Sequence, residues 1–402
     1  MGTNGLPPTM AAMHRIDTAE RRRRLAIRHH LAPMSKAKDI VTVAGDLVGV
    51  HSTDPASVYL GLLARMKSVT HADVARALYD DRSVLKILGM RRTMFVVPRD
   101  LAAIINTAVT RDIGLRERRR LIQMLQDAGV AKDVGRWVSK VEQETVDALG
   151  ELGEATATEL TKRVPGLRVQ MTFGEGKKWA GQVGVSTRML FLLAAEGRIV
   201  RGRPRGTWLS SMYAWSPLDA WLGEPLPEPE IDAARAELVR RWLRAFGPGT
   251  QRDIQWWTGW TVATTRNAVA AARAVEIELD AGTGLALADD LEQTAGGERW
   301  VALLPTLDTT TMGWFERSWY MGDHVKRLFD RNGNAGPTIW VDGRVVGGWA
   351  QRKSGEVLYR LFEDVGRETV GQIDAEAANI EKWLGESHVI PRFRTPLEME
   401  LS

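Results

Sequence analysis

The stretch Val50-His-Ser-Thr-Asp-Pro55 gathers three side chains that could take part in proton transfer. A neutral imidazole at His51 can accept a proton, because the usual pKa of histidine lies close to pH 7. Thr53 can contact a water molecule through its hydroxyl group, and Asp54 adds a carboxylate. The candidate chemistry is therefore the activation of a water molecule, with His51, Thr53 and Asp54 as candidate catalytic residues.

The same stretch also has a purely structural interpretation. Asp is a favoured N-cap and Pro suits the first helical position, so Asp54 could simply cap a helix that begins at Pro55. Thr53 could help that cap, and His51 could be an ordinary half-buried histidine. The residue types alone leave both interpretations open.

Arginines cluster at residues 21–24, 116–120 and 201–205, although the net charge of the chain is only +4. Clustered guanidinium groups favour contacts with phosphates, whereas a run of charges is also common on a solvated helix face. Arg201, Arg203 and Arg205 are the best candidates for DNA binding, because they lie in a basic turn between two β-rich runs.

Arg91 and Arg92 are two further candidates for DNA binding. They lie within the apolar run 88–98, which is typical of a strand closed by Pro98. They could hold phosphates near His51, or they could be solvated on the surface. Asp308 follows another apolar strand and could face a channel or start a turn.

The clearest structural pattern runs from Val183 to Ser216. It predicts a helix that ends at Gly197, where a helix end favours a positive φ, and then two strands around the basic turn. Thr158–Arg163 supplies a preceding short helix. This succession of helix, turn, helix and basic wing is typical of a unit that docks onto nucleic acid.

The pattern of helices, strands and Pro-rich stretches predicts an α+β fold that is mainly helical. Three tandem winged-helix units are expected, followed by a β-rich C-terminal region. The expected segments are a disordered N-terminus (1–13), unit 1 with the His-Ser-Thr-Asp-Pro motif (14–130), unit 2 (131–216), a Pro-rich linker (217–230), unit 3 (231–296), and the β-rich region with a closing helix (297–402).

Composition excludes several classes of site. The chain has no Cys, which rules out a thiol nucleophile, a disulfide framework and Cys-ligated zinc or iron–sulfur sites. The spacing of the histidines suggests no metal site, and Gly333-Asn-Ala-Gly336 lacks the Lys of a phosphate-binding loop, so no cofactor is expected. No apolar run is long enough to span a membrane, and the N-terminus does not resemble a secretion signal. We expect a cytoplasmic protein.

Five segments together resemble the helix-turn-helix 42 superfamily, the AlkZ-like and YcaQ-like bacterial DNA glycosylases. The resemblance covers about 15–395 and implies three winged-helix units around a basic, concave DNA channel. It also implies excision of bulky or cationic alkylated purines, sometimes from interstrand crosslinks. The segments are Arg24–Leu31, Leu47–Ser57, Arg91–Pro98, Leu303–Asp308 and Val341–Trp349.

The chain departs from this family at the catalytic element, which is a Gln–apolar–Gln or Gln–apolar–Asp triplet before Asp-Pro. The matching positions are His51, Ser52 and Thr53. An N7-alkylated guanine is already cationic, so its departure needs little protonation. A neutral His51 could accept a proton from the attacking water, and Thr53 could contact the same water. A cationic His51 would repel the developing positive charge, so activity should be lost as His51 protonates.

We therefore expect a monofunctional DNA glycosylase that removes cationic N7-alkyl purines from alkylated or crosslinked double-stranded DNA. A Schiff base is not expected, because the lysines nearest in sequence, Lys38 and Lys67, belong to flanking helices. The chain should act as a monomer in association with the nucleoid. One alternative is a non-catalytic winged-helix DNA-binding protein, either a regulator or a damage sensor; another is a glycosylase in which His51 selects a different lesion.

Overall fold

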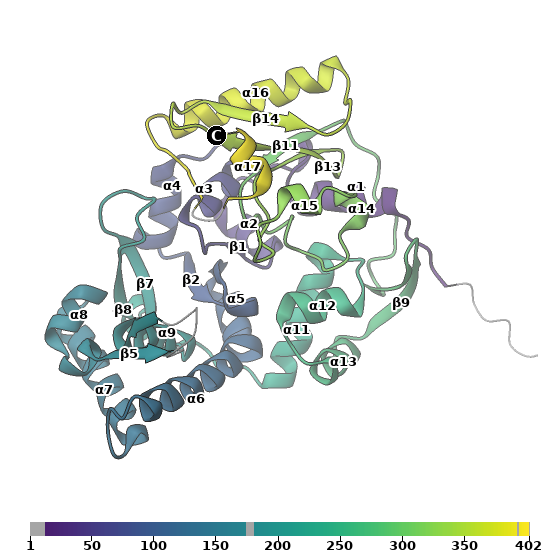
Figure 1. The fold of residues 1–402 in the computed structure, drawn as a ribbon. Helices are drawn as coiled ribbons and strands as arrows, with labels where there is room; N and C mark the ends of the chain where they lie inside the picture. Colours follow the sequence, from purple (N-terminus) through teal and green to yellow (C-terminus); the bar gives the residue numbers. More distant parts are fainter. Residues whose placement is uncertain (1–12, 174–180, 392–393, 402) are drawn as a thin grey trace, which may run out of the picture.

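A computed structural model of the chain describes residues 13–173, 181–391 and 394–401, and combines helices with short antiparallel strands (Figure 1). The expected disorder at residues 1–13 lies, apart from Met13, outside the described residues. The fold is therefore the mixture of helix and strand that the sequence predicts.

In the first unit a short strand is followed by two helices, and the helices are followed by a β-hairpin. Its strands are antiparallel and lie in the order β1-β3-β2. One-turn segments at Arg76–Asp80 and Asn106–Thr110 extend two of its helices. Its elements are α1 (Thr18–Arg28), α2 (Ile40–Asp46), β1 (Val50–His51), α3 (Pro55–Leu63), α4 (His71–Ala75), β2 (Val84–Leu88), β3 (Met94–Pro98), α5 (Arg99–Ile105) and α6 (Arg111–Asp127).

The single strand expected over residues 88–98 is wrong in its first half. β2 ends at Leu88, the chain turns, and β3 begins only at Met94. Within the turn Arg91 and Arg92 have φ values of 54° and 64°. This left-handed conformation is uncommon for residues other than Gly, so the two arginines give no sign of a turn; the glycine of the turn, Gly89, lies at its start, before them.

The second unit repeats the succession of the first. Its short strand β4 pairs with the last strand of the hairpin, in the order β4-β8-β7. Gly197 follows the long helix with a φ of 70°, as expected. The elements are α7 (Val134–Leu152), β4 (Ala155–Thr156), α8 (Ala157–Arg163), β5 (Gln170–Phe173), β6 (Gly181–Gly184), α9 (Val185–Ala195), β7 (Ile199–Pro204) and β8 (Tyr213–Pro217).

The third unit follows a connection that is partly helical. The segment 217–230, expected as a linker, begins with α10, whose Trp221 and Leu222 are buried. In this unit Gly249 forms an isolated antiparallel bridge with Leu285 at the step where the other units have β1 and β4. The elements are α10 (Leu218–Leu222), α11 (Ile231–Phe246), α12 (Gln251–Thr258), α13 (Val262–Ala271), β9 (Ala274–Leu279) and β10 (Gly282–Leu287).

In all three repeats the helix that follows the short-strand step starts with the same kind of N-cap. The side chains of Asp54, Thr156 and Thr250 accept a hydrogen bond from a main-chain N–H in the first turn of α3, α8 and α12. Such a cap satisfies a donor that the helix cannot satisfy itself. The step from short strand to capped helix is thus a shared structural device, and the residues 51–54 lie on it.

The C-terminal region is a four-stranded antiparallel sheet with α16 packed on it, as Figure 1 shows at the top of the molecule. Asp342 and Gly343 form the expected tight turn, with φ values of 47° and 81°. The elements are β11 (Val301–Leu304), α14 (Ser318–Met321), α15 (Val325–Leu328), β12 (Thr338–Val341), β13 (Arg344–Gln351), β14 (Val357–Leu361), α16 (Arg367–Leu384) and α17 (Pro396–Leu401).

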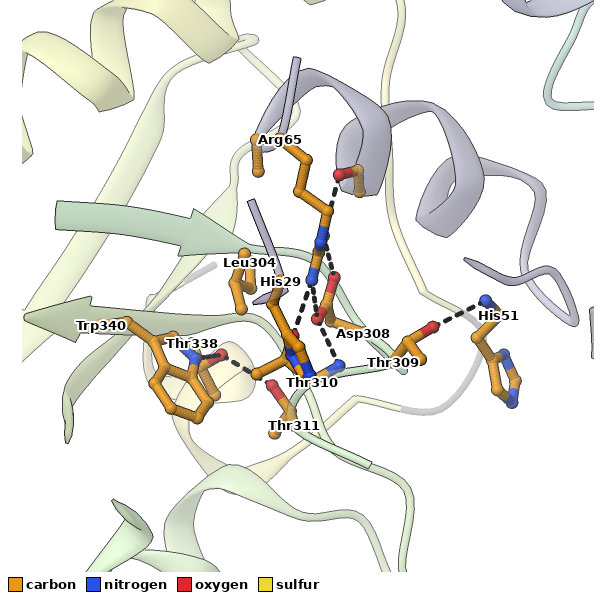
Figure 2. A network of polar contacts seen from close by, with 12 residues as sticks. His29, His51, Arg65, Leu304, Asp308, Thr309, Thr310, Thr311, Thr338 and Trp340 are labelled. Atoms are coloured by element: carbon orange, nitrogen blue, oxygen red, sulfur yellow. Dashed lines mark hydrogen bonds and ion pairs between the residues drawn. The ribbon is translucent and has the colours of Figure 1, made fainter. Parts of the chain in front are cut away.

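A buried ion pair joins this region to the first unit (Figure 2). The Arg65 guanidinium, just after α3, donates to both carboxylate oxygens of Asp308 at 2.8 and 2.7 Å, and both side chains are almost fully buried. Asp308 also accepts from the main-chain N–H of Thr310 at 2.8 Å, so it has the turn role and does not face a channel.

The network continues through Thr310 to the third unit. Arg65 donates to the Thr310 hydroxyl at 2.8 Å, so that hydroxyl can give its own proton to Nδ1 of His29, 2.7 Å away. Nε2 of His29 then donates to the carbonyl oxygen of Ala245 in α11 at 3.1 Å. Burial lowers the pKa of His29, which keeps the ring neutral in this arrangement. One chain of polar contacts therefore connects α1, α11 and the C-terminal region.

Replacing Asp308 by Asn should lower the free energy of unfolding by about 3 kcal/mol, because the Arg65 charge would stay buried without its partner. Urea denaturation of the full chain measures this. Asp289→Asn, which removes an exposed partner of Arg244, is the matched control and should cost less than about 1 kcal/mol. Equal urea midpoints for the two variants would contradict a structural role for the buried pair.

Candidate active site and nucleic-acid interface

His51 lies at the end of β1, opposite Phe95 in β3. Its main-chain N–H donates to the Thr309 hydroxyl at 2.9 Å, and that hydroxyl donates to the carbonyl oxygen of Gly49 at 3.2 Å. Figure 2 shows the imidazole pointing away from Thr309. The ring meets Phe95 edge to face, with centroids 5.1 Å apart. The backbone of His51 is therefore fixed by the loop that also carries Asp308.

The His51 imidazole is 2% exposed, and neither ring nitrogen has a hydrogen-bond partner among the described residues. Burial, with a smaller contribution from the nearby charge of Arg91, lowers the pKa of His51 to about 3. The ring is thus neutral at physiological pH, with one donor and one acceptor unsatisfied. Buried polar atoms are usually paired, so both ring nitrogens of His51 are available to a group that reaches the ring from outside the chain.

The two neighbouring candidates have structural contacts. The Thr53 hydroxyl is exposed and accepts from the main-chain N–H of Met94 at 3.3 Å. Asp54 accepts from the N–H of Ala56 at 2.8 Å, and burial raises the pKa of its carboxyl group. Capping accounts for Asp54, since the other two repeats have a cap at the same step. The catalytic roles of His51, Thr53 and Asp54 remain predictions.

Three of the five predicted DNA-binding arginines come together around a hollow of about 630 Å³. Arg92 reaches it from the turn between β2 and β3, and Arg201 and Arg205 reach it from the β7–β8 hairpin. Arg188, in the first turn of α9, completes the basic lining. Sequence reasoning missed Arg188, because a lone arginine in an apolar helix gives no pattern; only its place in the first turn of the long helix could have suggested it.

The wing arginines already have partners within the chain. Arg203 pairs with Asp80 at 2.6 Å and Arg205 with Glu154 at 2.9 Å, all on exposed side chains. Arg201 is half-buried, and its guanidinium lies 4.4 Å from the centre of the Tyr213 ring. Exposed ion pairs contribute little free energy, so Arg203 and Arg205 can exchange their carboxylates for phosphates at low cost.

The tip of the wing is docked on other parts of the chain. Trp208 packs against Tyr59 of α3 and His71 of α4, with ring centroids 4.5 and 4.7 Å away. Its Nε1 donates to the Ser387 hydroxyl at 3.3 Å. The hairpin therefore spans from the second unit to the first unit and the C-terminal region, and its tip is held in place.

Arg91 and Arg92 diverge although they are neighbours in the chain. Arg92 points toward the second unit, where its guanidinium lies 5.3 Å from the centre of the Phe191 ring of α9, and it also pairs with Glu117 of α6 at 3.1 Å. Arg91 points toward the third unit, where its guanidinium lies 3.8 Å from the centre of the Trp256 ring. The structure therefore separates Arg91 from the hollow and places it on the opposite side of the β2–β3 turn.

Within residues 13–173, 181–391 and 394–401, no group of three or more His, Asp or Glu side chains is placed to hold a metal ion. Among the helices that the structure describes, none has the length and apolar character needed to cross a membrane.

Comparison with known proteins identifies a matching family model and a similar solved structure. The family model described as "DNA glycosylase AlkZ-like" matches residues 44–383. The solved structure of the DNA glycosylase AlkZ from Streptomyces sahachiroi matches with a TM-score of 0.72 and 20% sequence identity, covering 93% of this chain and 98% of that one. At this identity the structural match shows a shared fold. No curated protein sequence matches the chain.

The free energy of unfolding should decrease as the pH is lowered, because of His51. Below pH 6.5 the unfolded chain binds a proton at this position, whereas the folded chain binds one only near its pKa of about 3. Between pH 7 and pH 5 this should remove about 2 kcal/mol from the free energy of unfolding. His51→Gln, which does not titrate, should lose that much less over the same interval in urea denaturation. An equal loss in both proteins would show that the folded state protonates His51 freely.

Proposed function

Because the chain belongs to the AlkZ-like DNA glycosylase family, we propose that it cleaves the N-glycosidic bond of cationic N7-alkyl purines in double-stranded DNA. The lesions include those held in interstrand crosslinks. Their bond to the sugar is already weakened by the positive charge on the base. The protein's task is then to position the damaged nucleotide and a water molecule.

The observation that carries this proposal is the neutral, buried and unsatisfied imidazole of His51. It stands where the family has the first Gln of its catalytic triplet. In the reaction the C1′–N9 bond breaks, its electron pair neutralises the purine cation, and water attacks C1′. His51 takes the proton that this water loses, and Thr53 contacts the same water. Both ring nitrogens are covered in the free protein, so DNA binding must expose one of them.

The repeated succession of helix, short strand, two helices and hairpin supports three tandem winged-helix units as the DNA-binding framework. The basic hollow between α9 and the wing supports contacts to the DNA backbone. A single chain supplies all three units, so we propose that it acts as a monomer on nucleoid DNA in the cytoplasm. We also propose a monofunctional reaction without a Schiff base, because the lysines nearest to His51 in sequence, Lys38 and Lys67, lie outside the His-Ser-Thr-Asp-Pro motif.

A second candidate function is DNA binding without catalysis. The observation in its favour is that the His51 ring nitrogens have no accessible surface in the free protein and both family glutamines are replaced. Such a protein would bind damaged duplexes and leave the base in place. Base release distinguishes the two functions.

Wild-type protein should release N7-methylguanine from a duplex, and His51→Ala should reduce the rate about 100-fold by removing the proton acceptor. The double variant His51→Gln, Thr53→Gln, which installs the family's glutamines, should keep activity. The rate should be lost as His51 protonates, at a pH between its pKa of about 3 in the free protein and the usual histidine value of about 6.5, because exposure by DNA removes part of the burial that lowers the pKa. Duplex binding by each variant controls for folding. Intact binding with no release by either wild type or the Gln variant would favour the non-catalytic function.

Arg205→Ala should weaken binding to all duplexes alike and lower the slope of log K against log salt by about one, because one phosphate contact is lost. Titrations at several salt concentrations measure this. Arg163→Ala is the control, since Arg163 is an exposed arginine paired with Glu151 and lies outside the basic hollow. An unchanged slope for Arg205→Ala would argue against a phosphate contact by the wing.

A further inference from the structure

The turn between β2 and β3 carries an arginine, Arg91, that does not line the basic hollow. Arg91 rests its side chain against Gly259, the C-cap of α12, and its guanidinium stacks 3.8 Å from the centre of the Trp256 ring. It forms no hydrogen bond or ion pair with any described residue, and its Nε is buried. Its charge is thus positioned by an aromatic ring alone.

A second guanidinium lies on the same ring. The Arg317 guanidinium carbon lies between two rings, 4.7 Å from the centre of Phe329 and 5.1 Å from the centre of Trp256, and one of its N–H groups donates to the carbonyl oxygen of Trp314 at 3.0 Å. Its Nε is also buried without a partner. The pKa of Arg91 falls to about 10, first because of burial and then because of the charge of Arg317. Two like charges are therefore held together although no described carboxylate pairs with either.

This arrangement differs from that of the nearest comparable arginine. Arg252, on α12 like Trp256, stacks 3.8 Å from the centre of the Phe315 ring but has a carboxylate partner, Glu316, at 3.4 Å. Arg91 and Arg252 stack on an aromatic ring at the same distance. Arg252 has a carboxylate partner, whereas Arg91 has none among the described residues. Two planar guanidiniums with free donors match the oxygens of a phosphate, which can be bound by both at once.

The backbone of the turn indicates that this placement is not incidental. Arg91 and Arg92 both occupy the left-handed region without being Gly, which costs free energy and persists only where the surroundings enforce it. Their contacts place Arg91 on the third unit and Arg92 on the second. The turn lies next to His51, since β3 begins at Met94 and Phe95 pairs with His51.

We propose that Arg91, Arg317 and Trp256 form a clamp for a single DNA phosphate, the one adjoining the damaged nucleotide. The two guanidiniums bind the phosphate oxygens, and the indole fixes their spacing. The clamp would anchor the backbone beside His51 while Arg92 and the wing hold the duplex on the other side. This inference rests on the proposed DNA glycosylase function, and adds Arg317 and Trp256 to the residues that position the substrate.

The test combines protein variants with DNA in which one phosphate is neutralised. The duplex contains an unreactive tetrahydrofuran abasic site, and a methylphosphonate replaces each phosphate near that site in turn. Affinity is measured at several salt concentrations for the full-length wild type, Arg91→Gln, Arg317→Gln and Arg91→Lys, with Arg252→Gln as the matched control. Thermal melts verify that each variant is folded.

For the wild type, a methylphosphonate at one flanking position should weaken binding about tenfold, as expected for loss of hydrogen bonds to a charged group. The same methylphosphonate should have little further effect on Arg91→Gln or Arg317→Gln, whose salt slopes should already be lower by about one. Arg91→Lys should recover the slope, and Arg252→Gln should behave like the wild type.

Two results would overturn the clamp, and they differ in what they say about the proposed function. If the wild type binds the duplex but every methylphosphonate weakens wild type and Gln variants by the same factor, the clamp is wrong and DNA binding stands. If the wild type does not bind damaged duplexes at any salt concentration, the DNA-binding function fails, and the clamp fails with it.

Discussion

The buried ion pair between Arg65 and Asp308 is the interaction on which the geometry of the site depends. Two charges removed from water are stable only if further hydrogen bonds satisfy them, and here Gly61, Thr310 and His29 complete the network. Thr309, between Asp308 and Thr310 in the chain, holds the main chain of His51. The loop that carries the carboxylate is thus also the support of the candidate catalytic residue, so core stability and site geometry are coupled.

Comparison of the three units shows which residues of the His-Ser-Thr-Asp-Pro motif have a structural role in the fold. Each unit needs an N-cap where its short strand passes into the next helix, and Asp54, Thr156 and Thr250 meet that need with different side chains. In the second and third units the cap has no neighbour like His51. Asp54 is therefore explained by its unit, whereas the buried imidazole of His51 is not. The chemistry that we propose for the motif therefore rests on positions 51 and 53.

Local patterns in the sequence were sufficient for much of the fold. The helix before Gly197, the basic hairpin after it and the Asp342-Gly343 turn follow from periodicity and turn residues, and the structure has all of them. The turn at Arg91 was missed because a left-handed arginine has no sequence signature. Contacts between distant segments could not be predicted from the sequence either, because they form only when the units are assembled. They include the partners of the wing arginines, the docking of Trp208 and the Arg65–Asp308 pair.

The replacement of glutamine by His51 is physically less severe than the change of residue type suggests. A glutamine amide offers both donors and an acceptor at any pH, whereas histidine offers one of each only when it is neutral. Burial and the nearby charge of Arg91 hold the pKa of His51 at about 3, so the neutral form persists wherever the protein is folded at ordinary pH. The environment thereby keeps one donor and one acceptor available on the imidazole, the two kinds of hydrogen bond that an amide also forms, while burial makes the ring a weaker base than an exposed histidine. Arg91, whose charge adds to the effect of burial on His51, is also the arginine that stacks on Trp256, which links the charge state of the site to its contact with the third unit.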